Sequence, residues 1–421
     1  MRKANPFYGW MIVLGAIVFL ALSAPISVSL TSLFATAVTE DTGISLSQFT
    51  LSNTLLQGVG ILLAPLASRL LSTKYFKKIH IAMTALYGTA IAMLGFANHL
   101  YVFYLISLVK GIAFVFIGII PVAMMISNWF EWKRGKAMSL AMTGLSMGGV
   151  IFGPLVSKWL LEYGWRQTYI IYGVMLLAIG LPISLFIYQR VPEDKGLTKL
   201  ISNQSDEMQT KIQNRQIYLS GQESLGKPFF LMLLIGMLFA GLVNGGGLGQ
   251  FPRAFSLAHG AVFGGLLISI YSLVGIFGKL LLGWLNDTFG IKVAIIYSAG
   301  TLSLVFFFML FSNQLWAAFV AAILYGSANA IGTVVGPLLV ASLYTVENYG
   351  DAYGIIQSAQ QTGMTFGSIA VATLFDRTGS YQPAWLLFLV LAAAVLVLWL
   401  PALKLSQKYL IKQKEREDVH A

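Results

Sequence analysis

The amino-acid sequence predicts an all-α membrane protein whose twelve transmembrane helices form two pseudo-symmetric six-helix bundles. Of the 421 residues, 57% are hydrophobic and only 10% are charged, whereas about a quarter of the residues in a soluble domain carry a charge. Uncharged runs of roughly 20 residues, the length that crosses a bilayer, recur along the whole chain. In addition, shifting the second half back by 219 residues aligns a pattern of glycines and hydroxyl side chains with the first half.

The apolar runs define twelve predicted spans. With Lys110 and Lys279 as charged exceptions, they cover residues 8–34, 51–71, 76–97, 100–126, 137–156, 167–188, 229–251, 261–285, 293–311, 315–343, 352–375 and 384–403. The first run is too long for the apolar region of a signal peptide and lacks a small-residue cleavage site, so we expect it to be retained.

Basic residues set the expected orientation. The chain has 27 lysines and arginines against 16 acidic residues, a formal net charge of +11. With a cytoplasmic N-terminus, most basic residues fall in cytoplasmic loops and the tail, and four fall outside: Lys158, Arg166, Arg253 and Arg377. This positive-inside distribution predicts a multi-pass protein of the cell (plasma) membrane with both termini in the cytoplasm. The net positive charge is therefore explained by the orientation of the protein in the lipid bilayer, and we expect no nucleic acid as a partner.

A polar and charged segment lies at the centre of the chain and divides the spans six and six. We therefore expect an N-terminal six-helix bundle over residues 1–190, a cytoplasmic linker loop over 191–227, a C-terminal six-helix bundle over 228–405 and a cytoplasmic tail over 406–421.

The two halves are predicted to be internal repeats, as in many transporters. The shift places Gly135, Ser139, Thr143, Gly144 and Gly148 over Gly354, Ser358, Thr362, Gly363 and Gly367. It also pairs Gly60 with Lys279 and Lys110 with Asn329. Each lysine therefore occurs in one repeat and is replaced by an uncharged residue in the other. This asymmetry makes both lysines candidates for function.

Lys110 and Lys279 lie inside predicted spans, about 15 Å and 9 Å from the nearer span end at 1.5 Å per helical residue. The sequence places all 16 acidic residues outside the spans or at their ends. A lone ammonium in the hydrocarbon is unfavourable, so we expect both lysines to face a water-filled cavity in which an anionic substrate is the partner. Two alternatives remain open: Lys279 could snorkel along its stem, and Lys110 could hold helices together through backbone carbonyls.

The sequence from Gly283 to Lys292 carries the pattern G-x-L-x-D-x-x-G-x-K. With twelve spans divided six and six around a basic loop, it resembles the major facilitator superfamily, and this resemblance covers essentially the whole chain. It implies the major facilitator fold, with gating residues on the cytoplasmic side: Asp287, Gly283, Gly290, Lys292 and, from the loop before span five, Arg134.

Within that superfamily, three short segments resemble the monocarboxylate transporters and the oxalate/formate antiporters. These are residues 128–137, 164–166 and 376–381. In that branch a cation in span eight binds the substrate carboxylate, and Lys279 stands at the matching position. The second cation of the oxalate pattern is replaced by Gln360, which argues against a dicarboxylate. The acidic residue of the monocarboxylate pattern is replaced by Gly275, which argues against proton coupling there.

Polar residues in other spans complete the expected substrate site. They are Gln57, Asn244, Tyr271, Asn329 and Gln357, with Gln360 one turn after the last of these. Asn244 precedes three glycines that permit either an unwound segment or close helix packing. No phosphate-binding loop, metal-ligand spacing or catalytic triad occurs, so we expect neither an enzyme nor a cofactor or metal.

These features predict a monomeric secondary active transporter of small organic anions, monocarboxylates first, working by alternating access with a proton or counter-anion as coupling partner. One alternative is a multidrug or amphiphile exporter of the same superfamily, which the G-x3-G-P sequence at Gly149, Gly153 and Pro154 favours. A second alternative is a non-transporting membrane receptor or sensor. The repeat symmetry and the two intramembrane charges favour transport.

Overall fold

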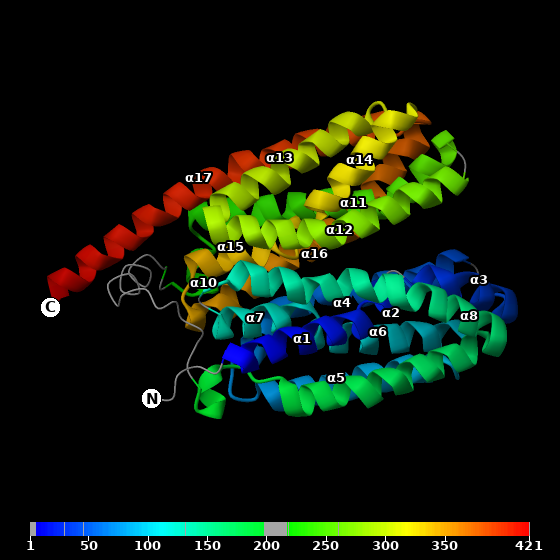
Figure 1. The fold of residues 1–421 in the computed structure, drawn as a ribbon, viewed down its shortest axis with the longest axis horizontal. Coiled ribbons are helices and arrows are strands. Elements are labelled where there is room, and N and C mark those ends of the chain that lie inside the picture. Colours follow the sequence, from blue (N-terminus) through cyan, green and yellow to red (C-terminus); the bar gives the residue numbers. More distant parts are fainter. Residues whose placement is uncertain are drawn as a thin grey trace. The chain divides into compact units, whose positions relative to one another are not determined.

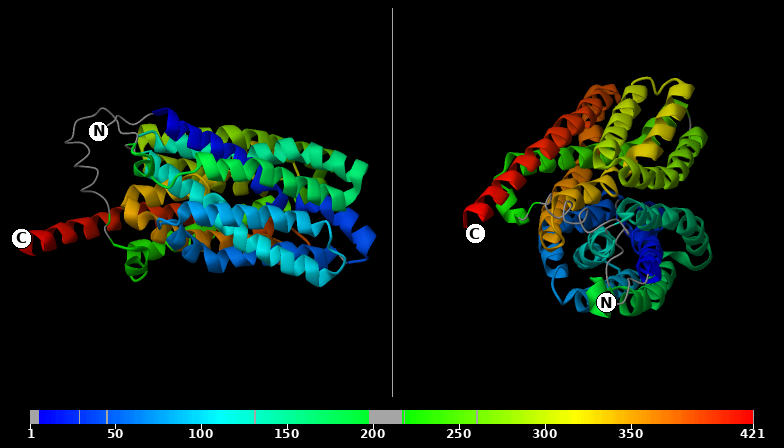
Figure 2. Two further views of the ribbon diagram at one scale, coloured as in Figure 1. Left: turned by 90° about the horizontal axis from the view of Figure 1, so that it is seen from below. Right: turned by 60° about the vertical axis from the view of Figure 1, so that its left-hand side comes forward.

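The computed structural model describes residues 6–28, 30–44, 46–130, 132–197, 217, 219–259 and 261–420. The secondary structure of these ranges is helical, without β-strands. The first half contains α1 (Pro6–Ser23), α2 (Pro25–Val28), α3 (Thr31–Thr42), α4 (Leu46–Leu71), α5 (Phe76–Leu94), α6 (Leu100–Ile117), α7 (Ile119–Trp129), α8 (Arg134–Pro182), η1 (Ile183–Ile187) and η2 (Pro192–Lys195). Figures 1 and 2 show that the long helices within each half run side by side.

The second half repeats this arrangement of long helices. It contains α10 (Gly221–Ser224), α11 (Pro228–His259), α12 (Ala261–Phe289), α13 (Ile291–Met309), α14 (Leu315–Ala328), η3 (Asn329–Ile331), α15 (Val335–Leu343), α16 (Val346–Thr378) and α17 (Gln382–His420). The all-helical fold predicted from the apolar runs is therefore confirmed.

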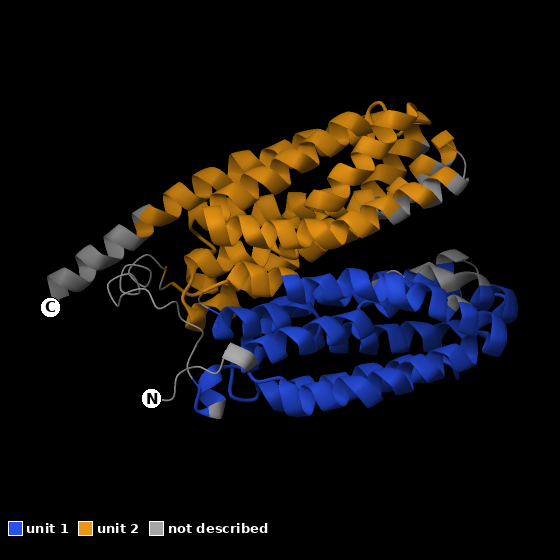
Figure 3. Cartoon of the chain, in the orientation of Figure 1, with its two compact units in different colours: residues 1–130, 140–200 blue, residues 131–139, 201–421 orange. Residues whose placement is uncertain are grey.

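The chain forms two compact units (Figure 3). Unit 1 comprises residues 1–130 and 140–200, and unit 2 comprises residues 131–139 and 201–421. Residues 131–139, which lie just before predicted span five and include its first residues, group with the second half of the chain. The reason is a set of contacts with α12, described below.

Nine helical segments in the described residues are long and apolar enough to cross a membrane. The other three predicted spans, 76–97, 261–285 and 352–375, form the long helices α5, α12 and α16. Of these three helices, α16 is the one rich in polar and small residues. In α16, Gln357 and Gln360 are buried, as expected for helices that face protein rather than lipid.

Several predicted spans are interrupted. Span one breaks at Ala24, between α1 and α2, because Pro25 has no N–H to continue the helical hydrogen-bond pattern. Span four divides at Gly118 into α6 and α7, and span ten divides between α14 and α15. Spans five and six form one helix, α8, apart from Gly164, whose φ of 73° is left-handed and favours glycine. Broken helices at matching places in two repeats are typical of transporter binding sites.

The repeat predicted from the sequence is visible in the glycine contacts. A Cβ atom on Gly144 or Gly148 of α8 would collide with the carbonyl oxygens of Ile17 and Ala21 in α1. In the second half, a Cβ atom on Gly363 or Gly367 of α16 would collide with the carbonyl oxygens of Leu238 and Leu242 in α11. Glycine thus permits the same close helix approach in both halves.

The three glycines after Asn244 also serve packing. Gly245 approaches the backbone of Met364, Gly246 the ring of Phe388, and Gly247 the ring of Tyr325, while α11 continues as a helix through all three. The structure therefore favours close packing over the unwound segment.

Candidate functional site

Lys279 lies in α12 with 6% of its surface exposed. Its Nζ is 3.5 Å from the carbonyl oxygen of Gly275, one turn earlier on the same helix. This face of α12 lies against the interruption of span ten: a Cβ atom at Gly275 would stand 3.7 Å from Nδ2 of Asn329, an ordinary van der Waals contact. The Lys279 ammonium is therefore held on the face of α12 that meets this interruption.

Asn244 joins the same region from α11. Its Nδ2 donates to the carbonyl oxygen of Asn329 over 2.9 Å, a carbonyl released where α14 gives way to η3. The hydroxyl of Tyr325 donates to the carbonyl oxygen of Asn244 over 3.3 Å, and the ring of Tyr271 packs edge-on against that of Tyr325. Four of the predicted site residues, Lys279, Asn244, Asn329 and Tyr271, thus belong to one cluster inside unit 2.

Two glutamines of α16 contribute further buried amides. The side chain of Gln360 lies against Gly332, where a Cβ atom would collide with its Nε2, so Gln360 reaches the interruption of span ten from the opposite helix. Gln357 is buried one turn earlier. Among the described residues, the side-chain oxygens of Gln357, Gln360 and Asn244 are buried without a hydrogen-bond partner. The described part of unit 2 therefore holds one buried ammonium, together with several amides able to orient a small polar ligand.

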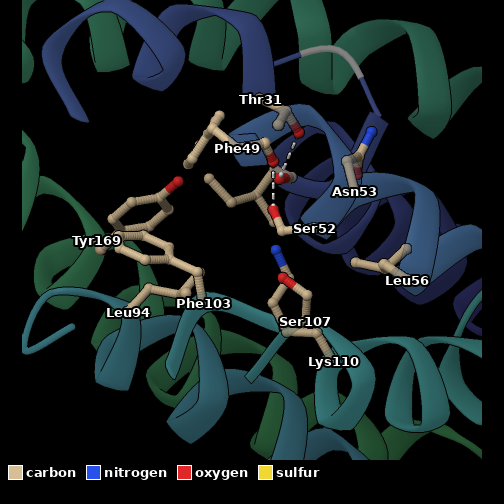
Figure 4. Close-up of a pocket in the computed structure, with 11 residues that line it drawn as sticks. Thr31, Phe49, Ser52, Asn53, Leu56, Leu94, Phe103, Ser107, Lys110 and Tyr169 are labelled. Atoms are coloured by element: carbon tan, nitrogen blue, oxygen red, sulfur yellow. Dashed lines mark hydrogen bonds between the residues drawn. The ribbon is translucent and has the colours of Figure 1, made fainter. Parts of the chain in front are cut away.

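Lys110 occupies a second site, inside unit 1. It lies on α6 with 5% of its surface exposed and lines a small pocket with residues of α2, α3, α4, α5, α6 and α8: Ile26, Thr31, Phe49, Ser52, Asn53, Leu56, Leu94, Phe103, Ser107 and Tyr169. Figure 4 shows the lysine side chain directed into this pocket from α6. Gln57, the α4 residue predicted to contribute, is half-buried and does not line the pocket.

Gly111 explains how Lys110 comes to face α4. A Cβ atom on Gly111 would stand 2.7 Å from the carbonyl oxygen of Leu56, so only glycine allows α6 this close to α4. In unit 2, Gly275 of α12 corresponds to Leu56 under the repeat, and it lies next to Asn329, which corresponds to Lys110. The two sites are therefore built on the same helix crossing in the two halves.

Asp287 lies at the end of α12 and contacts the beginning of α8 within unit 2. Its Oδ1 accepts a hydrogen bond from the backbone N–H of Gly135 over 2.7 Å, and its Oδ2 accepts one from Lys136 over 2.8 Å. The first N–H groups of a helix lack intrahelical partners and carry the positive end of its dipole, so a carboxylate stabilises them. Asp287 therefore caps α8 from a distant helix.

Glycines make this contact possible. A Cβ atom on Gly135 would collide with the carbonyl oxygen of Gly283, and one on Gly283 with the Gly135 carbonyl and the Ser139 hydroxyl. Arg134 adds a hydrogen bond from Nη1 to the carbonyl oxygen of Ala341 in α15 over 2.9 Å. Four of the five predicted gating residues lie in or border this contact. They are Asp287, Gly283, Gly290 and Arg134.

Gly290 and Lys292 follow the contact along the chain. Gly290 separates α12 from α13 with a φ of 83°, a left-handed conformation that glycine adopts without strain. Lys292 is exposed at the start of α13.

A model of the Major Facilitator Superfamily matches residues 16–264 and 253–421 of the sequence. The chain belongs to the Major Facilitator Superfamily. An MFS-type transporter of Gibberella moniliformis is 25% identical over 269 residues, which cover 61% of this chain and 58% of that protein. Human monocarboxylate transporter 12 is 23% identical over 413 residues, covering 90% of this chain and 77% of that protein.

A solved structure supports the fold. The proton:xylose symporter XylE, bound to 6-bromo-6-deoxy-D-glucose, matches with a TM-score of 0.68 at 15% identity, covering 93% of this chain and 94% of that one. As a member of the Major Facilitator Superfamily, the chain is a multi-pass membrane transporter and not an enzyme. Its relatives act on chemically different compounds, so the substrate must be argued from the buried side chains.

Several residues of both sites were not predicted from the sequence. Ser107 lies three residues before Lys110, on the same face of α6, and this spacing was a usable signal. Tyr169 and Thr31 line the Lys110 pocket from distant parts of the chain, and Tyr325 supports Asn244 from α14. Nothing in the sequence around these three residues distinguishes them from ordinary core positions of a superfamily transporter.

Proposed function

We propose that this superfamily member is a secondary transporter of small organic anions, with Lys279 as the principal anchor for a substrate carboxylate. The observation that carries the proposal is the sign of the buried charge. Among the described residues, Lys110 and Lys279 are the buried lysines, and no arginine, aspartate or glutamate is buried. An anion that enters a low-dielectric cavity loses its hydration, and a fixed ammonium restores much of the lost interaction.

The neighbours of Lys279 support a monocarboxylate. Within unit 2 the buried cluster provides one ammonium, whereas the remaining polar groups, Gln360, Gln357, Asn244 and Asn329, are neutral amides. One carboxylate would be neutralised by Lys279, while a second would have only amides to face. Lys110 then contributes a positive field at longer range.

We further propose that alternating access is gated by the contact between Asp287 and the first turn of α8. The carboxylate, the two close glycines and Arg134 hold that end of α8 against α12 and α15, and releasing them would free it. The distribution of basic residues supports a plasma-membrane protein with cytoplasmic termini, in which this contact lies on the cytoplasmic side.

The decisive experiment is counterflow in proteoliposomes with a panel of labelled carboxylates. Lys279→Gln should abolish saturable uptake while the protein remains folded, because glutamine keeps most of the side-chain volume and loses the charge. Lys279→Arg should retain part of the uptake, since it keeps the charge with a different shape. Lys158→Gln is the matched control, because Lys158 is exposed on α8. Among the described residues its only ion-pair partner is Glu162, at 3.6 Å.

Carboxylate transport by Lys279→Gln at the parental rate would eliminate the anchor role. Uptake of neutral or cationic compounds by the parent protein would favour the exporter alternative. Imposing a proton gradient and an opposed anion gradient separately decides which of the two drives uptake.

A further inference from the structure

The Lys110 pocket has the composition of an anion site of its own. Lys110 makes no hydrogen bond or ion pair with any described residue, although 95% of its surface is buried. Its ammonium is directed into the pocket rather than toward solvent (Figure 4). A buried full charge requires a partner, and the described part of the chain does not provide one.

Neutral donors line the same pocket as this ammonium. The hydroxyl of Ser107, the amide of Asn53 and the hydroxyl of Tyr169 line the pocket, and none of them hydrogen bonds to a described residue. Ser52 differs, because its hydroxyl donates to the carbonyl oxygen of Phe49 over 2.7 Å. The three donors come from α6, α4 and α8, so three separate helices contribute N–H or O–H groups to the lining of one pocket.

The pocket lining excludes a cation as occupant. No aspartate or glutamate is among the described residues that line it, and Lys110 is the only charged residue in that set. The contact between Gly111 and the backbone of Leu56 fixes the distance between α6 and α4. It therefore also fixes the spacing of the backbones that carry Ser107 and Asn53.

Size narrows the choice of anion. The cavity measures about 10 Å³, roughly the room that one water molecule needs. A monatomic anion requires the least room of the common anions, whereas a carboxylate with a carbon chain requires several times that volume. We propose that the Lys110 pocket binds a chloride ion, held by the ammonium together with Ser107, Asn53 and Tyr169.

This site is separate from the proposed substrate anchor. The pocket lies wholly in unit 1, whereas Lys279 and its amides lie in unit 2. A bound chloride would neutralise the Lys110 ammonium, so the positive field that unit 1 exerts would depend on chloride concentration. Chloride would then act as an inorganic regulator of transport, or as the counter-anion.

The test is a chloride titration of thermal unfolding with the full-length protein in nanodiscs. Ionic strength is held constant with isethionate, a two-carbon sulfonate much larger than chloride. We expect the melting temperature to rise saturably with chloride in the parent and in Lys279→Gln, and not in Lys110→Met. The Lys279→Gln arm separates this proposal from the proposed function, because that variant tests the carboxylate anchor and keeps the chloride pocket intact.

Variants that keep the ammonium guard against a misfolded Lys110→Met. Ser107→Ala and Asn53→Leu should each raise the half-saturating chloride concentration several-fold, because each removes one donor. Bromide should give an anomalous-scattering peak in contact with the Lys110 ammonium. The proposal is overturned if the parent shows no chloride dependence, or if Lys110→Met shows the same dependence as the parent. It is also overturned if half-saturation is unchanged in both donor variants, or if the pocket holds no bromide; water is then the occupant.

Discussion

Replacing Asp287 with asparagine tests the proposed gate directly. The carboxylate accepts hydrogen bonds from the backbone N–H groups of Gly135 and Lys136 at 2.7 and 2.8 Å. Asparagine keeps one acceptor oxygen, presents an NH₂ group to the other N–H and loses the charge that complements the helix dipole. The expected result is weaker attachment of the start of α8 to the end of α12.

The size of the effect follows from these two bonds. A hydrogen bond to a charged group contributes about 1.5–3 kcal/mol, and solvent screening reduces this for Asp287, which is exposed. Losing one such bond and the charge should therefore destabilise the contact by about 1–2 kcal/mol. That free energy corresponds to roughly a 5- to 30-fold larger population in which the contact is open.

The assay uses the absence of cysteine from the natural sequence. Ser139 is fully buried against Gly283, so the substitution Ser139→Cys places a single thiol under the contact. Its reaction rate with a water-soluble maleimide follows the open population when opening and closing are fast relative to labelling. Adding Asp287→Asn should accelerate labelling about 5- to 30-fold.

Thr288→Val serves as the neighbouring control, since Thr288 is exposed and the substitution conserves shape. The gating role is refuted if labelling is equally fast with aspartate and asparagine at position 287. An equal acceleration in Thr288→Val would show that the loop is merely sensitive to substitution.

Two further predictions concern packing and pH. Gly111→Ala should destabilise the protein by about 1–3 kcal/mol, because the new Cβ atom would collide with the Leu56 backbone. Gly58→Ala should not destabilise it, because the space around Gly58 is open. The melting temperatures of both variants test this prediction. The Ser220 backbone N–H donates to Glu223 and lowers the pKa of that carboxyl. The stabilisation of α10 by the Glu223 carboxylate is therefore present above the unfolded-state pKa and is lost as the pH falls through the lowered pKa of the folded state. Hydrogen exchange in α10 should accelerate on acidification in the parent and show no such step in Glu223→Gln.

Much of the fold could be predicted from the sequence because the membrane imposes a simple rule. Charged residues and free backbone groups are unfavourable in hydrocarbon, so uncharged runs of span length mark the helices. The same rule singles out Lys110 and Lys279, whose burial the structure confirms. The repeat was equally accessible, because Gly144 and Gly363 are required by the same close approach of two backbones in each half.

The composition of each site was decided by the tertiary structure. Asn244 bonds to the backbone of Asn329, and Tyr169 reaches the Lys110 pocket from α8, and neither contact leaves a periodic trace in the sequence. Residues 131–139 belong to unit 2 because the Asp287 carboxylate caps a helix that begins about 150 residues earlier, a spacing no local rule encodes. The length of an apolar run is a property of one segment and can be read from it alone. The partner of a hydrogen bond is the backbone group that tertiary packing places within about 3 Å.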